Sequence, residues 1–301
     1  MGDSAELLAL AAALIGALAQ IVTKGSIGAV PPWIYLPLRW FTSAGILVVV
    51  ATVLNLWPAF RWDETIVYPL AAAVLGPLIS WNLYTRAMGR LDLSVAYSIT
   101  QSSVLITIVI ATFWLGESPS VFTVIGAVIV LAGVWLVQGR VGLAPGKTVS
   151  LLGVALAGGT AICWGLNGPL WKLSVMAMSE IQVNLVRTGL ASVVFGVSLG
   201  VIALTSHAGR STMQIALTTG RRGLLSAALA GLLADVGAFW FQFSALKVGD
   251  VSTVTPILSS SPLFVALLSA GLLGERLRRA QIAGVVLIVI GVLIVGFAGR
   301  G

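Results

Sequence analysis

The sequence predicts an all-α integral membrane protein with ten transmembrane helices, arranged as two inverted five-helix repeats. Hydrophobic residues make up 58% of the 301-residue chain, whereas charged residues make up only 9%. A soluble domain carries about 25% charged residues, so this chain has too little charge to cover a water-facing surface. The division into two halves is predicted by an internal repeat at a constant spacing.

Long apolar runs between short polar segments predict the individual helices. A transmembrane helix needs roughly 20 apolar residues. Backbone groups in lipid must pair internally, which leaves helices or a closed barrel, and the runs here are continuous rather than alternating. The predicted spans are 5–23, 32–54, 66–88, 92–114, 120–138, 150–170, 180–205, 222–245, 251–273 and 278–298.

The repeat relates the first five spans to the last five. Leu115-Gly116-Glu117 recurs as Leu273-Gly274-Glu275, at an offset of 158 residues (275 minus 117). The same offset pairs Ala87 with Ala245, Asp92 with Asp250, Gly126 with Gly284 and Gly133 with Gly291. An offset of 148 residues (187 minus 39) pairs Lys24 with Lys172 and Arg39 with Arg187. Five spans are an odd number, so the second repeat must enter the membrane inverted. The predicted domains are 1–138, a connecting loop 139–149, and 150–301.

The last helices of the second half contain a set of short motifs: Ala245-Leu246-Lys247, Ser261-Pro262-Leu263-Phe264, Leu273-Gly274-Glu275-Arg276-Leu277, Gly284 and Gly291. These motifs resemble those of the EamA-type transporters of the drug/metabolite transporter superfamily. The first half repeats them more loosely, and an arginine early in the second helix of each half also fits. The resemblance implies a ten-helix exporter or exchanger of small metabolites. It also implies a central cavity lined by helices 1, 3, 4, 6, 8 and 9, without naming a substrate.

Asp235 lies near the middle of the eighth span, whose one basic residue is Arg222 at its first position. A carboxylate at the bilayer centre is costly; such residues usually face a cavity and often mark ion or proton pathways. The equivalent position in the first half is Pro77, so the acid belongs to one half only. We predict that Asp235 couples transport to protons. The alternative is a permanently protonated acid that is hydrogen-bonded between helices.

Two arginines and two prolines are predicted to take part in gating or in anion contact. Arg39 and Arg187 lie about two turns inside their spans, where an arginine either snorkels to the headgroups or holds an anionic group. Pro256 and Pro262 break backbone hydrogen bonds in the ninth span, which makes this helix the best candidate for a bending gate.

Polar and aromatic residues inside the spans are predicted to bind the substrate. Amides facing lipid are disfavoured, so they should point inward, and a cavity with amides, hydroxyls and aromatic rings suits an amphipathic organic solute. The candidates are Gln20, Trp81, Asn82, Tyr84, Tyr97, Gln101, Trp164, Asn167, Trp240, Gln242, Ser259 and Ser260. Some of the aromatic residues are expected to be interfacial anchors instead.

Glycines and acids at repeated positions are expected to be structural. Gly126 and Gly133 share a helix face, and small residues of this kind let membrane helices pack closely. Glu117 and Glu275 each precede a helix, where an acid complements the helix dipole and pairs free backbone donors.

The basic residues indicate the orientation in the membrane. Lys24, Arg86, Arg90, Arg140, Lys147, Arg210, Arg221, Arg222, Arg276, Arg278 and Arg279 fall on the side opposite the termini. Arg61, Lys172, Lys247 and Arg300 fall on the side of the termini. The positive-inside rule then places both termini outside the cytoplasm, although many transporters of the resembled family are thought to have them inside. Import and export both remain open.

Several functional classes are excluded or disfavoured. The single cysteine, Cys163, and the single histidine, His207, exclude a His/Cys metal site and a catalytic site built on histidine. No phosphate-binding G-x-x-x-x-G-K-[ST] motif occurs, so ATP is not the direct driver. The basic residues are scattered at membrane borders, which disfavours nucleic acid as a partner. Asp235 has no second mid-membrane carboxylate, which disfavours an intramembrane protease.

The sequence therefore predicts a secondary active transporter in the cell (inner) membrane of a prokaryote. It would move a small polar or amphipathic metabolite, such as an amino acid, by alternating access, with protons as an optional coupling ion. The alternatives are a facilitative uptake porter for sugars or metabolites and a flippase for lipid-linked substrates. No enzymatic activity and no cofactor are expected. The expected partners are the small-molecule substrate and membrane lipid, and a homodimer stays open.

Overall fold

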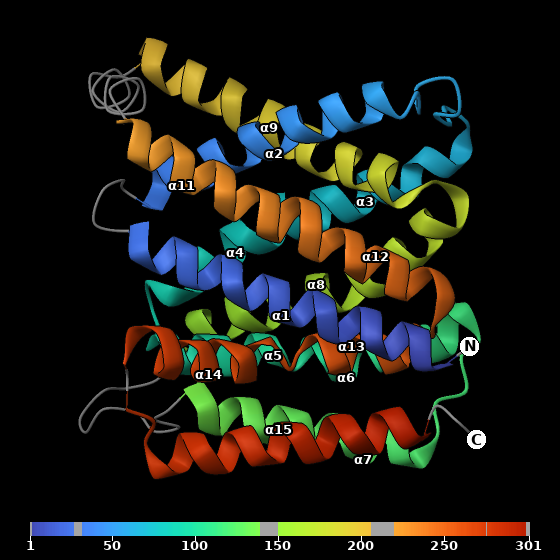
Figure 1. The fold of residues 1–301 in the computed structure, drawn as a ribbon, viewed down its shortest axis with the longest axis vertical. Coiled ribbons are helices and arrows are strands. Elements are labelled where there is room, and N and C mark those ends of the chain that lie inside the picture. Colours follow the sequence, from blue (N-terminus) through green and yellow to red (C-terminus); the bar gives the residue numbers. More distant parts are fainter. Residues whose placement is uncertain (1, 27–31, 139–149, 206–219, 275, 299–301) are drawn as a thin grey trace.

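The computed structural model describes residues 2–26, 32–138, 150–205, 220–274 and 276–298. All regular secondary structure within these ranges is helical (Figure 1), which confirms the predicted all-α class. The first five spans consist of α1 (Gly2–Ser26), α2 (Pro32–Val53), α3 (Val67–Ala73), η2 (Val74–Ser80), α4 (Trp81–Met88), α5 (Leu93–Gln101), α6 (Ser103–Ile110), η3 (Ala111–Leu115) and α7 (Val121–Gln138). The last five consist of α8 (Leu151–Ala177), α9 (Glu180–Thr205), α11 (Arg221–Gly231), η4 (Leu232–Ala238), α12 (Phe239–Val248), α13 (Val251–Leu258), α14 (Ser261–Leu273) and α15 (Arg279–Ala298).

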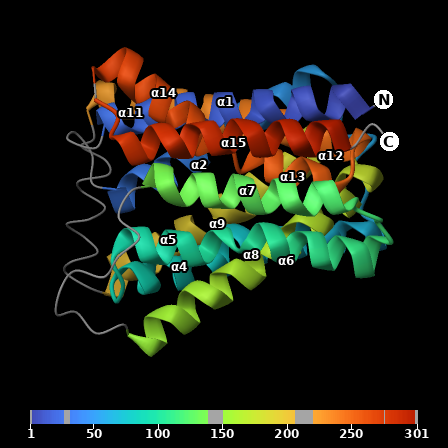
Figure 2. The same ribbon diagram turned by 90° about the horizontal axis from the view of Figure 1, so that it is seen from below.

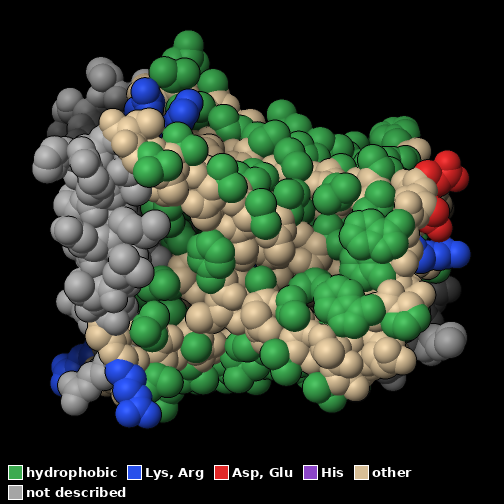
Figure 3. Space-filling model, turned by 90° about the horizontal axis from the view of Figure 1, so that it is seen from above, with side chains coloured by type: hydrophobic (Ala, Val, Ile, Leu, Met, Phe, Trp, Pro, Cys, Tyr) green, Lys and Arg blue, Asp and Glu red, His purple; other side chains and the backbone are tan. Residues whose placement is uncertain are grey.

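The described helices form a membrane-spanning bundle. Nine of them, counted within the described ranges, are long and apolar enough to cross a membrane, and α2 adds a shorter apolar stretch, Pro37–Val53. The helices run between two ends of the molecule, and the N- and C-termini lie at the same end (Figure 1). On the face that Figure 3 shows, hydrophobic side chains are spread over the band between these ends, and the charged side chains lie at the ends themselves. The protein is therefore a multi-pass integral membrane protein, as predicted.

Helical irregularities occur at equivalent positions in the two halves. The segments η2 and η4 are both π-helical, and their first residues, Val74 and Leu232, are 158 positions apart. Pro77 lies at the centre of η2 and Asp235 at the centre of η4. Proline lacks a backbone N–H and disturbs the ladder of η2 directly. Short π-helical segments inside α-helices are frequent at functional sites.

A second matched irregularity divides the fourth and ninth spans. The fourth span breaks at Ser102, between α5 and α6, and the ninth at Ser259–Ser260, between α13 and α14. After these spans the chain turns at Gly116 and at Gly274, whose φ angles are 70° and 67°. This left-handed conformation is readily adopted by glycine, which explains why glycine recurs at both positions.

Glycines bring α7 and α15 into backbone contact, and these helices lie side by side in Figures 1 and 2. A Cβ atom on Gly133 would lie 2.7 Å from the carbonyl oxygen of Gly284, and one on Gly126 would lie 2.8 Å from that of Gly291. These distances leave no room for a side chain. The expected packing role of the four glycines is confirmed.

We expect Gly133→Val to lower the free energy of unfolding by about 1–3 kcal/mol, because the added side chain must push α7 away from α15. The effect should appear as a lower melting temperature of the detergent-solubilised protein. Gly45→Val is the matched control, since a Cβ atom at Gly45 meets nothing within 4 Å. Equal melting temperatures for the two variants would contradict the assigned role.

Candidate functional site

A cavity of about 440 Å³ lies among the middle parts of the spans, and we call it the central cavity. Both halves of the chain contribute to its wall. Its lining residues are Arg39, Trp40, Gly76, Pro77, Trp81, Ser103, Val104, Thr107, Trp164, Asn167, Gly168, Trp171, Arg187, Asp235, Phe239, Gln242, Leu246, Thr255, Leu258 and Ser259. The volume falls within the range of about 300–1,000 Å³ typical of small-molecule sites.

The wall of the central cavity contains an ionic cluster, Arg39–Asp235–Arg187. Arg39 Nε lies 2.8 Å from Asp235 Oδ2, and Arg187 Nη2 lies 3.2 Å from Oδ1. The Asp235 side chain is fully buried. Ser43 Oγ, which donates to the backbone oxygen of Arg39 at 2.7 Å, also lies 3.3 Å from Asp235 Oδ2. The two arginines occupy equivalent positions of the repeat. Each half therefore supplies one guanidinium group to a single carboxylate.

Further contacts hold Arg187 and the backbone of η4 in place. Arg187 Nε donates to Asn184 Oδ1 at 3.0 Å, and its Nη2 donates to the backbone oxygen of Asp235 at 3.3 Å. Asn184 donates to the same backbone oxygen. The guanidinium carbon of Arg187 lies 3.6 Å from the centre of the Phe239 ring, a cation–π geometry. These contacts hold the guanidinium group of Arg187 in the orientation in which it faces the carboxylate of Asp235.

Asn167 has a comparable role at the other π-helical segment. With its amide oriented to satisfy both neighbours, it donates to the backbone oxygen of Ala72 at 3.1 Å and accepts from Gly76 N at 3.3 Å. A side chain of α8 thus forms hydrogen bonds with the backbone around η2, just as Asn184 and Arg187 of α9 do with the backbone of η4. Buried backbone polar groups need such partners.

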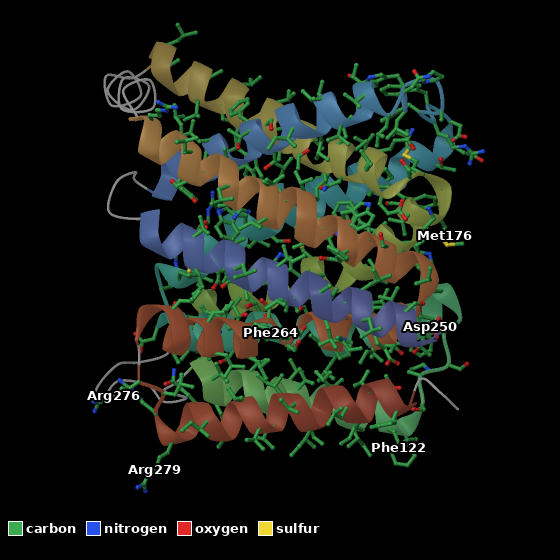
Figure 4. The ribbon with its side chains drawn as sticks, in the orientation of Figure 1. Phe122, Met176, Asp250, Phe264, Arg276 and Arg279 are labelled. Carbon is green, nitrogen blue, oxygen red and sulfur yellow. The ribbon has the colours of Figure 1, made fainter. Side chains whose placement is uncertain are left out.

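A second cavity, of about 400 Å³, lies at the end of the bundle opposite the N-terminus, and we call it the end cavity. Its lining includes Gln20, Tyr97 and Arg276, and Figure 4 shows Arg276 at the end away from Asp250. Tyr84 also lines the end cavity, and its ring centre is 5.9 Å from Trp81 and 5.6 Å from Trp164. Both tryptophans line the central cavity, so this aromatic group lies between the two cavities.

Comparison with known proteins identifies the family. The model of the EamA-like transporter family matches residues 3–138 and, separately, residues 151–297. This chain belongs to the EamA-like transporter family. The family is part of the drug/metabolite transporter superfamily, as the motifs indicated.

Two curated relatives of this EamA-like protein are named as transporters. "Uncharacterized transporter YvbV" of Bacillus subtilis (strain 168) is 25% identical over 275 residues, covering 91% of this chain and 85% of the relative. An "Uncharacterized transporter" of Archaeoglobus fulgidus is 30% identical over 140 residues, covering 46% of each chain. A solved structure, described as "Crystal structure of protein", has the same fold, with a TM-score of 0.78, 19% identity and coverage of 99% of this chain and 98% of the other. The EamA-like protein is a membrane transporter of the cell membrane, and these matches point away from an enzyme.

The structure distributes the predicted site residues of this EamA-like transporter over both cavities. The central cavity contains Arg39, Trp81, Trp164, Asn167, Arg187, Asp235, Gln242 and Ser259. The end cavity contains Gln20, Tyr84, Tyr97 and Pro262. Asn82, Gln101, Trp240, Pro256 and Ser260 line neither of these two cavities. Trp240 is 42% exposed, and Asn82 donates to the backbone oxygen of Leu78, in η2 of its own span.

The helices around the central cavity differ from the expected set. The second helix of each half, α2 and α9, contributes an arginine, whereas α1 contributes Gln20 to the end cavity only. The sequence reasoning missed Ser43, Asn184 and Phe239, all of which contact the ionic cluster. Asn184 could have been found, because residues three apart share a helix face and Asn184 precedes Arg187 by three.

Proposed function

We propose that this EamA-like protein is a secondary transporter that moves a small polar or amphipathic metabolite by alternating access. The observation that carries the proposal is the central cavity, which lies at mid-span depth and is lined by ionic, polar and aromatic residues of both halves. Substrate sites of transporters with inverted repeats lie near the bilayer midplane between the repeats. The two halves would rock about this cavity.

We further propose Asp235 as the coupling residue. Its carboxylate is ion-paired to α2 of the first half and to α9 of the second. Addition of a proton to Asp235 would weaken both ion pairs at once, and so change the contact between the halves. A coupling residue needs this link between its charge and the arrangement of the repeats.

The ninth span is proposed as a bending element. Pro256 and Pro262 lie on either side of the break at Ser259–Ser260, and Pro262 also lines the end cavity. Pro256, inside α13, removes a backbone hydrogen bond just before the break. Pro262 instead stands in the first turn of α14, where a missing N–H removes no helical hydrogen bond, so it starts this helix rather than weakening it. The break and Pro256 together lower the cost of bending. The equivalent break at Ser102 gives the first half a matching position.

The test is transport into proteoliposomes that contain the purified protein, with and without an imposed pH gradient. Labelled amino acids, sugars and aromatic metabolites are screened, and Asp235→Asn is run in parallel. Gradient-driven accumulation by the wild type, with mere equilibration by the variant, supports coupling through Asp235. Equilibration by both proteins indicates a facilitator or exchanger and refutes the coupling. If none of the tested solutes is transported, in liposomes of varied lipid composition, the proposed transport mechanism is refuted.

We expect Trp164→Ala to raise the KM for the transported solute roughly three- to tenfold, because aromatic contacts contribute about 0.5–1.5 kcal/mol beyond their buried area. Trp240→Ala is the matched control, since Trp240 lines neither cavity. The measurement is initial uptake rate against solute concentration. A KM that changes equally in both variants would argue against the central cavity as the substrate site.

A further inference from the structure

We infer that the central cavity selects an organic monoanion, whose charged group binds at Arg39 while its apolar body lies against tryptophan rings. The inference rests on the proposed function, since it names the substrate class of the same cavity. Neither the family nor the names of the relatives specify such a substrate.

The first argument is charge. Among the lining side chains of the central cavity, the charged residues are Arg39, Arg187 and Asp235. With an ionised Asp235, the ionic cluster has a net charge of +1. A net charge at mid-membrane depth is costly, so a ligand that removes it is favoured. A monoanion makes the loaded cavity neutral, whereas a cation would raise the charge to +2.

The second argument is accessibility. The Asp235 side chain is 0% exposed and that of Arg187 is 6% exposed, whereas that of Arg39 is 20% exposed. The cluster therefore presents a cation to the cavity and covers its carboxylate. A positively charged ligand would find no accessible carboxylate in this wall.

The third argument is the geometry of Arg39. Its Nη2 donates a hydrogen bond to Asp235 Oδ1 at 3.3 Å, whereas its buried Nε, 2.8 Å from Oδ2, forms an ion pair without a directed hydrogen bond. The contact with Asp235 therefore leaves part of the donor capacity of the guanidinium group unsatisfied. A guanidinium group binds carboxylate and phosphate oxygens well, so an incoming anion is a suitable further partner.

The body of the ligand is set by the rest of the wall. Trp81, Trp164 and Trp171 line the same cavity, and Trp40 follows Arg39 directly. Aromatic rings bury apolar surface and tolerate flat ligands in stacked or edge-on arrangements. The probe should therefore combine one negative charge with an apolar ring.

Three probes of matched shape test the charge preference: benzoate, benzamide and benzylamine. Their binding to purified protein in detergent micelles is measured by isothermal titration at neutral pH, with protein-free micelles subtracted. We expect benzoate to bind at least about tenfold more tightly than benzamide, as for hydrogen bonds to charged groups, and benzylamine to bind most weakly. Equal binding of the three probes, binding of none, or preference for benzylamine would overturn the inference.

Variants of the cluster should shift benzoate affinity in opposite directions. Arg39→Gln removes the accessible cation and should weaken benzoate binding about tenfold or more, whereas Arg39→Lys should retain part of it. Asp235→Asn raises the cluster charge to +2 and should strengthen benzoate binding. A merely structural role would weaken binding in both charge-changing variants. If Asp235→Asn does not fold, the benzoate affinities of Arg39→Gln and Arg39→Lys test the inference: equal affinity of Arg39→Gln and the wild type would refute it.

The control is Arg86→Gln, which removes one positive charge from an exposed side chain that lines neither cavity. Its benzoate affinity should equal that of the wild type. If Arg86→Gln and Arg39→Gln weaken binding equally, overall charge rather than the cavity attracts the anion, and the inference fails. Transport of neutral solutes in proteoliposomes would then still support the proposed function, so the two claims fail separately.

Discussion

Replacing Asp235 with alanine is expected to lower the free energy of unfolding by about 3–5 kcal/mol and to abolish transport. The variant leaves the buried guanidinium of Arg187 and the partly buried one of Arg39 without their shared carboxylate. Breaking a buried ion pair by removing one partner costs this much, because the remaining charge stays uncompensated. The measurement is chemical or thermal unfolding in detergent, together with uptake into proteoliposomes.

The control for this prediction is Asp250→Ala. Asp250 is an exposed acid at the end of the bundle, and its side chain makes no capping hydrogen bond to α13. We expect its stability to stay within about 0.5 kcal/mol of the wild type, as for most surface substitutions. Equal stability of Asp235→Ala and the wild type would show that the cluster contributes nothing to the folded state.

A double variant separates the effect of the cluster's net charge on stability from the effect of changing the side chains themselves. In Arg39→Gln/Asp235→Asn the cluster again has a net charge of +1, so the double variant should be more stable than the sum of the single variants predicts. Residues in one ionic network typically couple by about 0.5–3 kcal/mol. Strict additivity would mean that Arg39 and Asp235 do not interact in solution, despite the 2.8 Å separation of Nε and Oδ2.

The parts of the site that the sequence predicts are those that depend on one helix at a time. Asp235 stands out because a mid-span carboxylate is costly wherever its helix packs, and Arg39 and Arg187 stand out through their common offset. Their meeting depends on how α2, α9 and η4 cross, which hydrophobic periodicity does not specify. The same limit applies to Gln20, whose polar character is visible in the sequence but whose depth, in the end cavity, follows from packing.

The positions of the helices were easier to predict than their interruptions. Apolar runs mark the spans because lipid requires them. Only one of the two π-helical segments is indicated by the sequence. Pro77 indicates the irregularity of η2, whereas η4, which contains Asp235, has no proline. The breaks near Ser102 and Ser259 fall at matching serine pairs, Ser102-Ser103 and Ser260-Ser261, which are 158 residues apart. A pair of serines does not by itself predict a helix break, so equivalence within the repeat is the better guide to them.

Glu117 shows how a correct role can be assigned to the wrong helix. As expected, its carboxylate caps a helix N-terminus, but this helix is α13 of the other half rather than the helix that follows it. Glu117 Oε1 accepts from Val251 N at 2.7 Å, and Oε2 accepts from Ser252 N at 2.9 Å. Helix N-termini favour a negative charge, and both bonds are charge-assisted. Its repeat equivalent, Glu275, lies outside the described residues.

The cap joins the two halves at the end of the bundle that holds the termini, where Figure 4 shows Asp250. At the same end, Lys172 Nζ donates to the backbone oxygen of Gly249 at 2.9 Å. Under the proposed alternating access, opening the end that holds the termini requires α13 to leave Glu117.

Glu117→Ala is therefore expected to shift the protein toward states that are open at this end. Loss of two hydrogen bonds to a charged group, each contributing about 1.5–3 kcal/mol, should increase the open population at least about tenfold. The measurement is the rate at which a polar maleimide labels Ser252→Cys, in a Cys163→Ser background that removes the native thiol. Ser252 is buried and its backbone N–H is hydrogen-bonded to Glu117, so the labelling of a cysteine at this position reports the opening.

Glu180→Ala is the control, because Glu180 forms a partly exposed ion pair with Lys247 within the second half, and such pairs contribute little. A labelling rate that stays the same in Glu117→Ala, or rises equally in Glu180→Ala, would mean that the cap does not hold the halves together at this end.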